Sequence, residues 1–442
     1  MTSIPTTSIY SVLSAIVLLA SCGGGGSGDT APPVTSGNPP CTFDPKPFLN
    51  GARTTEATSV WQCTGTGVSP FDFLAFEDGS GYSSGVGDFR WRSSACGQIS
   101  IDASVPQTIS QISVNVAAGT GAFLAQQANG SVPTLCTRAA SKPAPRREQS
   151  ATYDSARNQT IIFGGIVEVK VHGSNTTVGR QLSDTWLYSA GQWRQITTAS
   201  TPSASLGMQM TFDRRRNLAV LVASPAGSTT VETWEFDGAA WMRNRTASAP
   251  PARRDHKLAF DSTRQVTVLY GGTGLSGSPF YYDTWEFNGS DWTLKASCTP
   301  PCSNAPATSP NQTAMTFSGA LGRTVLVGAN GSNATGTWTW DGAAWRVLAS
   351  GTPSSPPSFP ALTFDNIRSR LVLSTPALWE FDGTQWVNRS LGAQLPSGVT
   401  ALTLGSSLVF DESMGKTLIF AGFSGATFSN ELLTWDGLNF GR

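Results

Sequence analysis

From residue 143 onward, the chain repeats one pattern of apolar and polar positions. Each copy begins with a short apolar strand that ends in an aromatic residue and Asp, as in LAFD at 258–261, and a second apolar strand follows, as in VTVLYGG at 266–272. A third strand carries a tryptophan and leads through Asp-Gly or Asn-Gly to a second tryptophan. Alternation broken by such dipeptides is typical of β-hairpins. Each copy therefore predicts four strands.

Two tryptophans lie seven residues apart in five of the copies, and successive lead tryptophans are separated by 48, 51, 53, 41 and 56 residues. In the sixth copy we expect Trp435 in the lead position and Arg442 in the partner position. A buried tryptophan removes about 150–250 Å² from water, so these residues are expected to form the blade cores. The pairs are Trp186 and Trp193, Trp234 and Trp241, Trp285 and Trp292, Trp338 and Trp345, and Trp379 and Trp386.

A repeat of about fifty residues predicts a β-propeller, here with six blades over residues 143–442. An open stack would leave apolar end faces exposed, so we expect a closed ring. The last copy runs to Arg442 and the first begins near Gln149. The ring is therefore expected to close either by packing of the blades or through a strand lent by residues before Arg146.

The repeat resembles the kelch family, of the kind found in bacterial lipoproteins and in the central domain of galactose oxidase. The double glycine of kelch strands stands at Gly164-Gly165 and Gly271-Gly272 and survives as Ala421-Gly422. The other three copies lack it, so their blades are expected to turn differently there. The resemblance covers residues 143–442 and implies a kelch-like propeller.

The N-terminus has the features of an export signal. Residues 11–20 form an apolar run too short to span a membrane, which fits a signal peptide over 1–21. The segment 19–22, Leu-Ala-Ser-Cys, resembles the lipobox of bacterial lipoproteins and implies lipidation of Cys22, although the first ten residues carry no Lys or Arg. Gly23 in place of Asp implies the outer membrane rather than the inner one. The alternative is a plain secretory signal with an incidental cysteine.

Two further segments precede the propeller. Residues 22–40 are rich in Gly, Ser and Pro and predict a flexible tether. Residues 41–140 alternate short apolar runs with Asp78-Gly79 and other turns, which predicts a small β-meander or barrel domain. This region is similar to lipocalin-like lipoprotein domains through its hairpin and FxW strand. A barrel that holds an apolar ligand and a domain filled by its own side chains both remain open.

Seven cysteines leave six once Cys22 is set aside for lipid, and an exported chain is expected to pair them as disulfides. The spacing CTPPC predicts a local bridge between Cys298 and Cys302, since no second Cys or His pair completes a zinc site. The other four allow three connectivities for two bridges. They are Cys41, Cys63, Cys96 and Cys136.

Composition argues against several functions. Lys plus Arg equals Asp plus Glu at 29 each, so no positive field is available to hold nucleic acid. With two histidines, His172 and His256, we expect no metal and no cofactor. His256 is replaced by Gln149 in the first copy, which favours a structural role.

No catalytic motif is present. The copper ligands of galactose-oxidase-like enzymes and the SxDxGxxW boxes of sialidases are both missing, and neither HExxH nor a GxSxG in a strand-to-helix setting occurs. Arg147 and Arg254 occupy matching positions beside Glu148 and Asp255, which predicts a recurring ion pair where the chain enters a blade. We therefore expect no catalytic residues.

The sequence favours a membrane-anchored binding scaffold of the bacterial envelope that presents propeller loops to a protein or polysaccharide partner and touches the membrane through its lipid alone. The connections between the second and third strands vary most, and those at 166–183 and 273–282 are the longest. The alternatives are a carbohydrate-active enzyme with carboxylates in the propeller funnel and a purely structural envelope protein.

The lipobox resemblance predicts that Cys22→Ala abolishes lipidation. Cells expressing the full chain are labelled with radioactive palmitate, and the wild type is expected to incorporate label while the variant does not. Cys298→Ala serves as the control because its cysteine is expected to lie in a disulfide. Equal labelling of wild type and Cys22→Ala would contradict the anchor.

Overall fold

The computed structural model describes residues 142–442 with short gaps, together with the backbone of eight strands between residues 59 and 138. The chain divides into two compact units, one of residues 1–144 with 168–180 and one of 145–167 with 181–442. The described residues form strands and a single 3₁₀ turn at Pro310–Gln312, so the all-β prediction is confirmed. None of them forms a helix of the length and apolarity that a membrane crossing needs.

The strands of the first unit form one sheet in the order β6-β5-β4-β3-β2-β1-β8-β7. Its register places Cys63 directly opposite Cys136. Opposed residues of antiparallel strands have Cα atoms about 4.5–5.5 Å apart, within the range that a disulfide spans. Cys41 and Cys96 lie outside the described residues. The strands are β1 (Ser59–Gly65), β2 (Val68–Ala75), β3 (Ser80–Ser83), β4 (Gly87–Ala95), β5 (Gln98–Ala103), β6 (Ile112–Ser113), β7 (Ala122–Ala125) and β8 (Thr134–Arg138).

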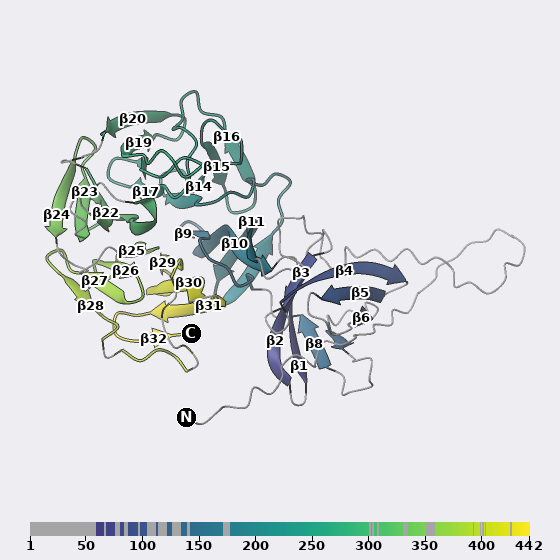
Figure 1. Ribbon diagram of the computed structural model, residues 1–442. Helices are drawn as coiled ribbons and strands as arrows, with labels where there is room; N and C mark the ends of the chain where they lie inside the picture. The colour runs from purple at the N-terminus through teal and green to yellow at the C-terminus, as the bar shows by residue number, and fades with distance from the viewer. Residues whose placement is uncertain are drawn as a thin grey trace, which may run out of the picture. The chain divides into compact units, whose positions relative to one another are not determined.

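The second unit is a six-bladed β-propeller, as the repeat predicts, and each blade is a sheet of four consecutive antiparallel strands. Figure 1 shows the blades arranged in a circle. Blade 1 comprises β9 (Ser150–Asp154), β10 (Gln159–Lys170), β11 (Thr177–Ser189) and β12 (Gln192–Ile196); blade 2, β13 (Gln209–Asp213), β14 (Leu218–Ala223), β15 (Glu232–Phe236) and β16 (Trp241–Asn244); blade 3, β17 (Lys257–Asp261), β18 (Val266–Tyr270), β19 (Asp283–Phe287) and β20 (Trp292–Ser297); blade 4, β21 (Ala314–Ser318), β22 (Arg323–Ala329), β23 (Thr335–Trp340) and β24 (Trp345–Ser350); blade 5, β25 (Ala361–Asp365), β26 (Arg370–Ser374), β27 (Leu378–Phe381) and β28 (Trp386–Asn388); blade 6, β29 (Ser407–Asp411), β30 (Lys416–Ser424), β31 (Thr427–Trp435) and β32 (Phe440–Gly441).

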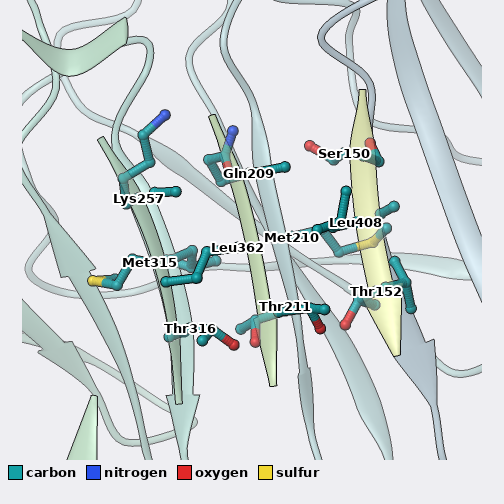
Figure 2. Close-up of a pocket in the computed structure, with 18 of the residues that line it drawn as sticks. Ser150, Thr152, Gln209, Met210, Thr211, Lys257, Met315, Thr316, Leu362 and Leu408 are labelled. Carbon is teal, nitrogen blue, oxygen red and sulfur yellow. The ribbon is translucent and has the colours of Figure 1, made fainter. Parts of the chain in front are cut away.

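The first strand of each blade is innermost and touches the first strands of both neighbouring blades. β29 of blade 6 contacts β9 of blade 1, so the ring is closed. The innermost strands surround a central cavity (Figure 2). Each described sheet of the second unit consists of consecutive strands of one blade, so no strand is exchanged where the ring closes. Closure combines packing between blades 1 and 6 with backbone hydrogen bonds of Arg146 to blade 6.

Apolar side chains fill the seam between each pair of neighbouring blades. Ile161 and Phe163 of blade 1 pack with Met210 and Trp241 of blade 2, for example. The closing seam joins Ile162, Trp186 and Trp193 of blade 1 to Phe420 and Leu432 of blade 6. Truncation of such an aromatic residue typically costs about 3–5 kcal/mol. The fully buried tryptophans are Trp186, Trp241, Trp292, Trp338, Trp340, Trp345, Trp386 and Trp435, whereas Trp193, Trp234, Trp285 and Trp379 are half-buried.

A repeated hydrogen bond accompanies this packing. In four seams, the indole Nε1 of the second tryptophan donates to the threonine that precedes the lead tryptophan of the previous blade. A buried indole N–H needs an acceptor, so this bond removes a desolvation cost at the centre of the seam. The bonds run from Trp241 to Thr185 (2.9 Å), from Trp292 to Thr233 (2.9 Å), from Trp345 to Thr284 (2.9 Å) and from Trp386 to Thr337 (2.8 Å).

The prediction for the sixth copy is wrong for both the lead and the partner position. Trp435 pairs with Phe440, as Trp340 pairs with Trp345, so Phe440 and not Arg442 holds the partner position. The turn Asp436-Gly437 sets the hairpin register, and counting back from it places Leu433 in the lead position. Arg442 instead forms an ion pair with Glu431 at 3.3 Å.

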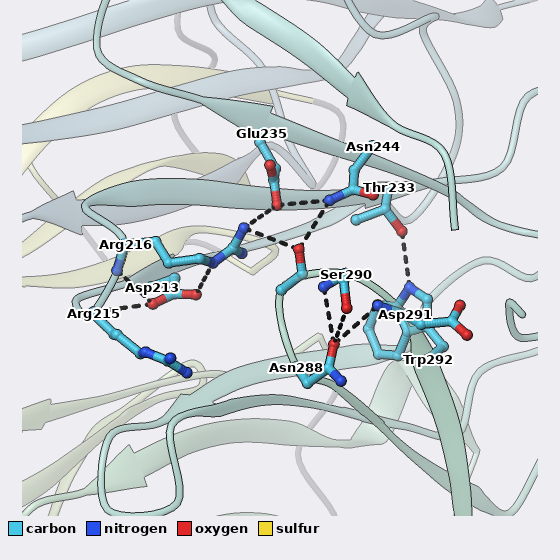
Figure 3. Close-up of polar contacts among 11 residues, drawn as sticks. Asp213, Arg215, Arg216, Thr233, Glu235, Asn244, Asn288, Ser290, Asp291 and Trp292 are labelled. Atoms are coloured by element: carbon cyan, nitrogen blue, oxygen red, sulfur yellow. Dashed lines mark hydrogen bonds and ion pairs between the residues drawn. The ribbon is translucent and has the colours of Figure 1, made fainter. Parts of the chain in front are cut away.

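A second recurring contact joins the blades at the turn between the first and second strands. In blade 2, Asp213 accepts backbone hydrogen bonds from Arg215 (3.0 Å) and Arg216 (3.1 Å), and it also accepts a bond from Arg216 Nε at 2.6 Å (Figure 3). The Arg216 guanidinium then reaches blade 3, where it donates to the carbonyl of Gly289 at 3.3 Å. A Cβ at Gly289 would lie 2.9 Å from Arg216 Nε. The same approach occurs between Arg157 and Gly238, Arg264 and Gly342, and Arg368 and Gly437.

The Asp-Gly turns therefore have two reasons for their glycine. One is the left-handed backbone, with φ of +98° at Gly342 and +102° at Gly383. The other is the neighbouring arginine. Blades 4 and 6 have Leu321 and Met414 in the arginine position, and a Cβ at Gly383 or Gly191 of the next blade would meet nothing within 4 Å.

This difference predicts unequal effects of two matched substitutions. Gly342→Ala and Gly383→Ala introduce the same left-handed alanine, but only the first displaces an arginine, Arg264, from its hydrogen bonds. We expect the free energy of unfolding to fall by about 1–2 kcal/mol more in Gly342→Ala. Denaturant titration of both variants measures this, and an equal loss would show that the arginine contact adds no stability.

Candidate functional site

The central cavity has a volume of about 420 Å³ and is lined by the six innermost strands (Figure 2). Each innermost strand ends in an aspartate that begins the turn to the second strand, or in Ser318 in blade 4. Equivalent lining positions of the six blades are found by counting back from this residue. The position four residues earlier holds Ser150, Gln209, Lys257, Ala314, Ala361 and Ser407. The position two residues earlier holds Thr152, Thr211, Ala259, Thr316, Thr363 and Val409. These two layers are therefore mostly polar, with Lys257 as their one charged residue.

One mouth of the cavity is shaped by left-handed residues. The position six residues before the turn aspartate has positive φ in five blades: Glu148 (56°), Gly207 (59°), Asp255 (61°), Phe359 (47°) and Gly405 (64°). We call this ring of residues the rim. Left-handed conformations are rare for residues other than glycine, and they concentrate at functional sites. The rim is therefore the first candidate for a binding site.

Backbone hydrogen bonds between blades hold the rim in place. Glu148 N donates to Gly405 O at 3.1 Å, which ties blade 1 to blade 6. Asp255 N donates to Gly207 O at 3.1 Å, and Phe359 N donates to the carbonyl of Asn311 at 2.8 Å. These bonds fix the backbone from which the side chains of Glu148, Asp255 and Phe359 project.

Charged groups occupy one half of the rim, on blades 1 to 3. Glu148 forms an ion pair with Arg147, and Asp255 lies 3.9 Å from Arg254, so the predicted recurring ion pair is present in both blades. Gly207 of blade 2 lies against Asp255, because a Cβ at Gly207 would be 2.3 Å from Asp255 N. Lys257 projects from the wall just inside (Figure 2).

These groups influence one another's ionisation. Burial raises the pKa of Glu148, the Arg147 guanidinium opposes this, and the Asp255 carboxylate raises the pKa further. Burial lowers the pKa of Lys257, against which the Asp255 and Glu148 carboxylates act. The two acids and the lysine therefore form one electrostatic cluster.

The other half of the rim is aromatic. The Phe359 ring packs edge-on against Phe423 with ring centroids 5.9 Å apart. The Arg147 guanidinium lies over the Phe423 ring at 5.7 Å and joins the two halves. The mouth thus combines an apolar surface with hydrogen-bonding groups on the opposite side.

The opposite mouth is bridged by side chains. Arg214 of blade 2 forms an ion pair with Glu412 of blade 6, with a second contact from Arg214 Nη1 to Glu412 Oε2 at 3.3 Å. Asn366 Nδ2 of blade 5 donates to Glu412 Oε1 at 2.8 Å. These contacts obstruct that end, so the rim offers the more open approach to the cavity.

Sequence reasoning missed a second, buried set of arginines. Arg146 donates to both oxygens of Asp184 at 2.6 and 2.7 Å, and Trp186 Nε1 donates to the same carboxylate at 2.8 Å. Arg253 binds Asp283 in the same way in blade 3. The doubled arginine that precedes blades 1 and 3 was the available signal, because one arginine of each pair binds the buried aspartate while the other pairs with the rim acid.

His256 is fully buried, and neither ring nitrogen has a hydrogen-bond partner among the described residues. Its counterpart Gln149 donates to Ser407 Oγ at 2.9 Å and to the Phe420 carbonyl at 3.0 Å, across the closing seam. His256 does not line the cavity. Gln149 therefore serves the closing seam, whereas His172 lies outside the described residues.

The variable connections lie on the rim side. In blade 3, Thr273 forms antiparallel backbone β-bridges with both Arg254 and Phe280. The Phe280 side chain is 50% exposed. The blade 1 connection was expected to be a loop, but β10 continues to Lys170 and β11 begins at Thr177. Its alternating Val-Glu-Val-Lys-Val sequence favours such strand extension.

Cys298 and Cys302 form a disulfide.

No cluster of three or more His, Cys, Asp or Glu residues that could hold a metal ion occurs in the described part of the chain. Neither a scan of protein-family models nor a comparison with curated proteins gives a match for this chain.

The buried His256 predicts a loss of stability in acid. Burial, with Arg253 and Lys257 nearby, holds the pKa of His256 well below its usual range. The unfolded chain therefore takes up a proton below about pH 6.5 while the native protein does not, so stability falls as pH decreases, by up to about 1.4 kcal/mol per pH unit. His256→Gln, which copies blade 1, is expected to reduce this loss between pH 7.5 and 5 in thermal unfolding. His172→Gln is the control, and an unchanged pH dependence in His256→Gln would contradict the assignment.

Proposed function

We propose that this protein is a kelch-type envelope lipoprotein whose propeller binds a polysaccharide at the rim. The observation that carries the proposal is the asymmetry of this mouth, with Glu148 and Asp255 of the rim and Lys257 just inside it on one side and Phe359 on the other. Small-ligand sites commonly join apolar surface to a few convergent polar groups.

The polar half suits hydroxyl-rich ligands. Carboxylates such as Glu148 and Asp255 accept hydrogen bonds from sugar hydroxyls, while the Lys257 amine donates to hydroxyl or ring oxygens. Hydrogen bonds to charged groups are stronger than neutral ones, so each contact adds orientation as well as affinity. The aromatic half offers Phe359 to the apolar C–H face of a sugar ring.

The dimensions favour a saccharide unit over a protein surface. A cavity of about 420 Å³ lies within the roughly 300–1,000 Å³ typical of small-ligand sites. A stable protein partner needs about 800 Å² of complementary surface, which the rim alone does not offer. The exposed Phe280 of the blade 3 connection extends the surface along which a longer chain would lie.

The anchor completes the proposal. Lipid on Cys22 and the flexible segment 22–40 would hold the propeller at the outer membrane, near envelope polysaccharides. Cys22 and this segment lie outside the described residues, so support comes from the sequence alone.

A carbohydrate-active enzyme is the second candidate, favoured by the proximity of Glu148 and Asp255. Glycosidases use two carboxyl groups, one with a raised pKa as general acid, and both burial and Asp255 raise the pKa of Glu148. Release of reducing sugar by the wild type and its loss in Glu148→Gln would select this function over binding alone.

Affinity electrophoresis in gels that contain neutral or acidic polysaccharides tests the binding proposal. We expect at least one polysaccharide to retard the wild type, and Phe359→Leu to weaken apparent binding about tenfold because it removes the ring but keeps an apolar side chain. The control is Leu391→Ala, since Leu391 is 80% exposed and does not line the cavity. Failure of every polysaccharide to retard the wild type would overturn the proposal.

A further inference from the structure

Lys257 differs from every other charged residue that lines the cavity. Arg214 pairs with Glu412, Glu148 with Arg147, and Asp255 with Arg254. The Lys257 amine has no hydrogen bond or ion pair with any residue that the structure describes. It therefore remains available to a ligand.

The fold itself does not require a cation at this position. The equivalent residue is Ser150 in blade 1, Gln209 in blade 2, alanine in blades 4 and 5, and Ser407 in blade 6. Placing an ammonium group in a partly desolvated wall costs free energy unless an anion compensates it. The Glu148 and Asp255 carboxylates compensate Lys257 only partly, because each also faces an arginine. A lysine that the repeat does not require and that no hydrogen bond fixes at this position points to a ligand.

The surroundings favour an anion despite the two acids. Arg147 balances Glu148 and Arg254 balances Asp255, so Lys257 leaves this half of the rim with a net positive charge. Beside Lys257, Gln209 projects into the cavity from the neighbouring strand, and Thr152, Thr211 and Thr316 lie in the layer below (Figure 2). Amide and hydroxyl groups of this kind complete the coordination of an oxyanion with neutral donors.

We propose that Lys257 forms the centre of an oxyanion site, where the cavity binds a carboxylate, phosphate or sulfate group carried by the ligand. This deepens the proposed function, on which it rests for the nature of the ligand, since the polysaccharide would then be an acidic one. Lys257 would hold the anionic substituent inside the mouth while the sugar ring lies against Phe359.

Titration calorimetry at constant ionic strength tests the site with small probes. The probes are D-glucuronate, D-glucose 6-phosphate, D-glucose 6-sulfate, inorganic phosphate and neutral D-glucose. We expect at least one sugar-borne anion to bind with one-to-one stoichiometry and more tightly than D-glucose. Binding of inorganic phosphate as tight as that of the sugar phosphate would assign the site to a free anion and overturn the acidic-polysaccharide part.

Lys257→Gln is the decisive variant, because glutamine occupies the same position in blade 2. We expect it to weaken anion binding at least tenfold, whereas Lys416→Gln, a lysine that does not line the cavity, changes it less than twofold. If Lys257→Gln lowers the melting temperature markedly, Lys257→Arg keeps the charge and is expected to retain binding. Absence of binding by all anions, or equal binding by Lys257→Gln, overturns the site.

The outcomes separate this site from the proposed function. If neutral polysaccharides retard the protein through Phe359 but no anion binds, the proposed function stands and the oxyanion site is wrong. If small anions bind through Lys257 but no polysaccharide retards the protein, the oxyanion site stands and the proposed function is wrong.

Discussion

The rest of this structure depends on the seam between blades. A four-stranded sheet has two faces, and in a ring each face is covered by a neighbour rather than by solvent. The seams combine an apolar cluster with two polar contacts that recur, the bond from indole to threonine and the approach of a turn arginine to a glycine of the next blade. Apolar burial supplies most of the stability. The polar contacts satisfy the groups that the seam buries and fix how one blade meets the next.

The closing seam joins two blades that come from opposite ends of the repeat, and Arg146 makes contacts with both of them. The backbone of Arg146 donates to Ser429 at 3.1 Å and accepts from Gly422 at 2.9 Å, both in blade 6. Its side chain meanwhile binds Asp184 of blade 1. One residue therefore joins the first and last blades. The buried charge of Arg146 is tolerated because the Asp184 carboxylate accepts hydrogen bonds from both of its terminal nitrogens. The Gly164 carbonyl accepts a further bond from one of them.

Requirements for folding and for binding fall on alternate residues of the innermost strands. Side chains such as Met210 and Leu362 pack in the seams, also reach the cavity wall, and stay apolar from blade to blade. Their neighbours face the cavity and are free to differ, which allows Lys257 to stand where other blades have Ser, Gln or Ala. The rim carries the same freedom, since its left-handed backbone accepts Glu148, Gly207 or Phe359. The repeat thus builds a uniform ring around a non-uniform site.

The sequence alone determined the number of blades, the four strands in each and the turns between them, because hairpin periodicity and Asp-Gly turns are local properties. It also indicated the ion pairs of Arg147 and Arg254. It misplaced the partner of Trp435, since register depends on the turn and not on the nearest match in spacing. Only the tertiary structure brought Glu148, the neighbouring Asp255 and Lys257, and Phe359 to one mouth, because they belong to blades 1, 3 and 5 and ring closure alone decides which blades face one another across the cavity.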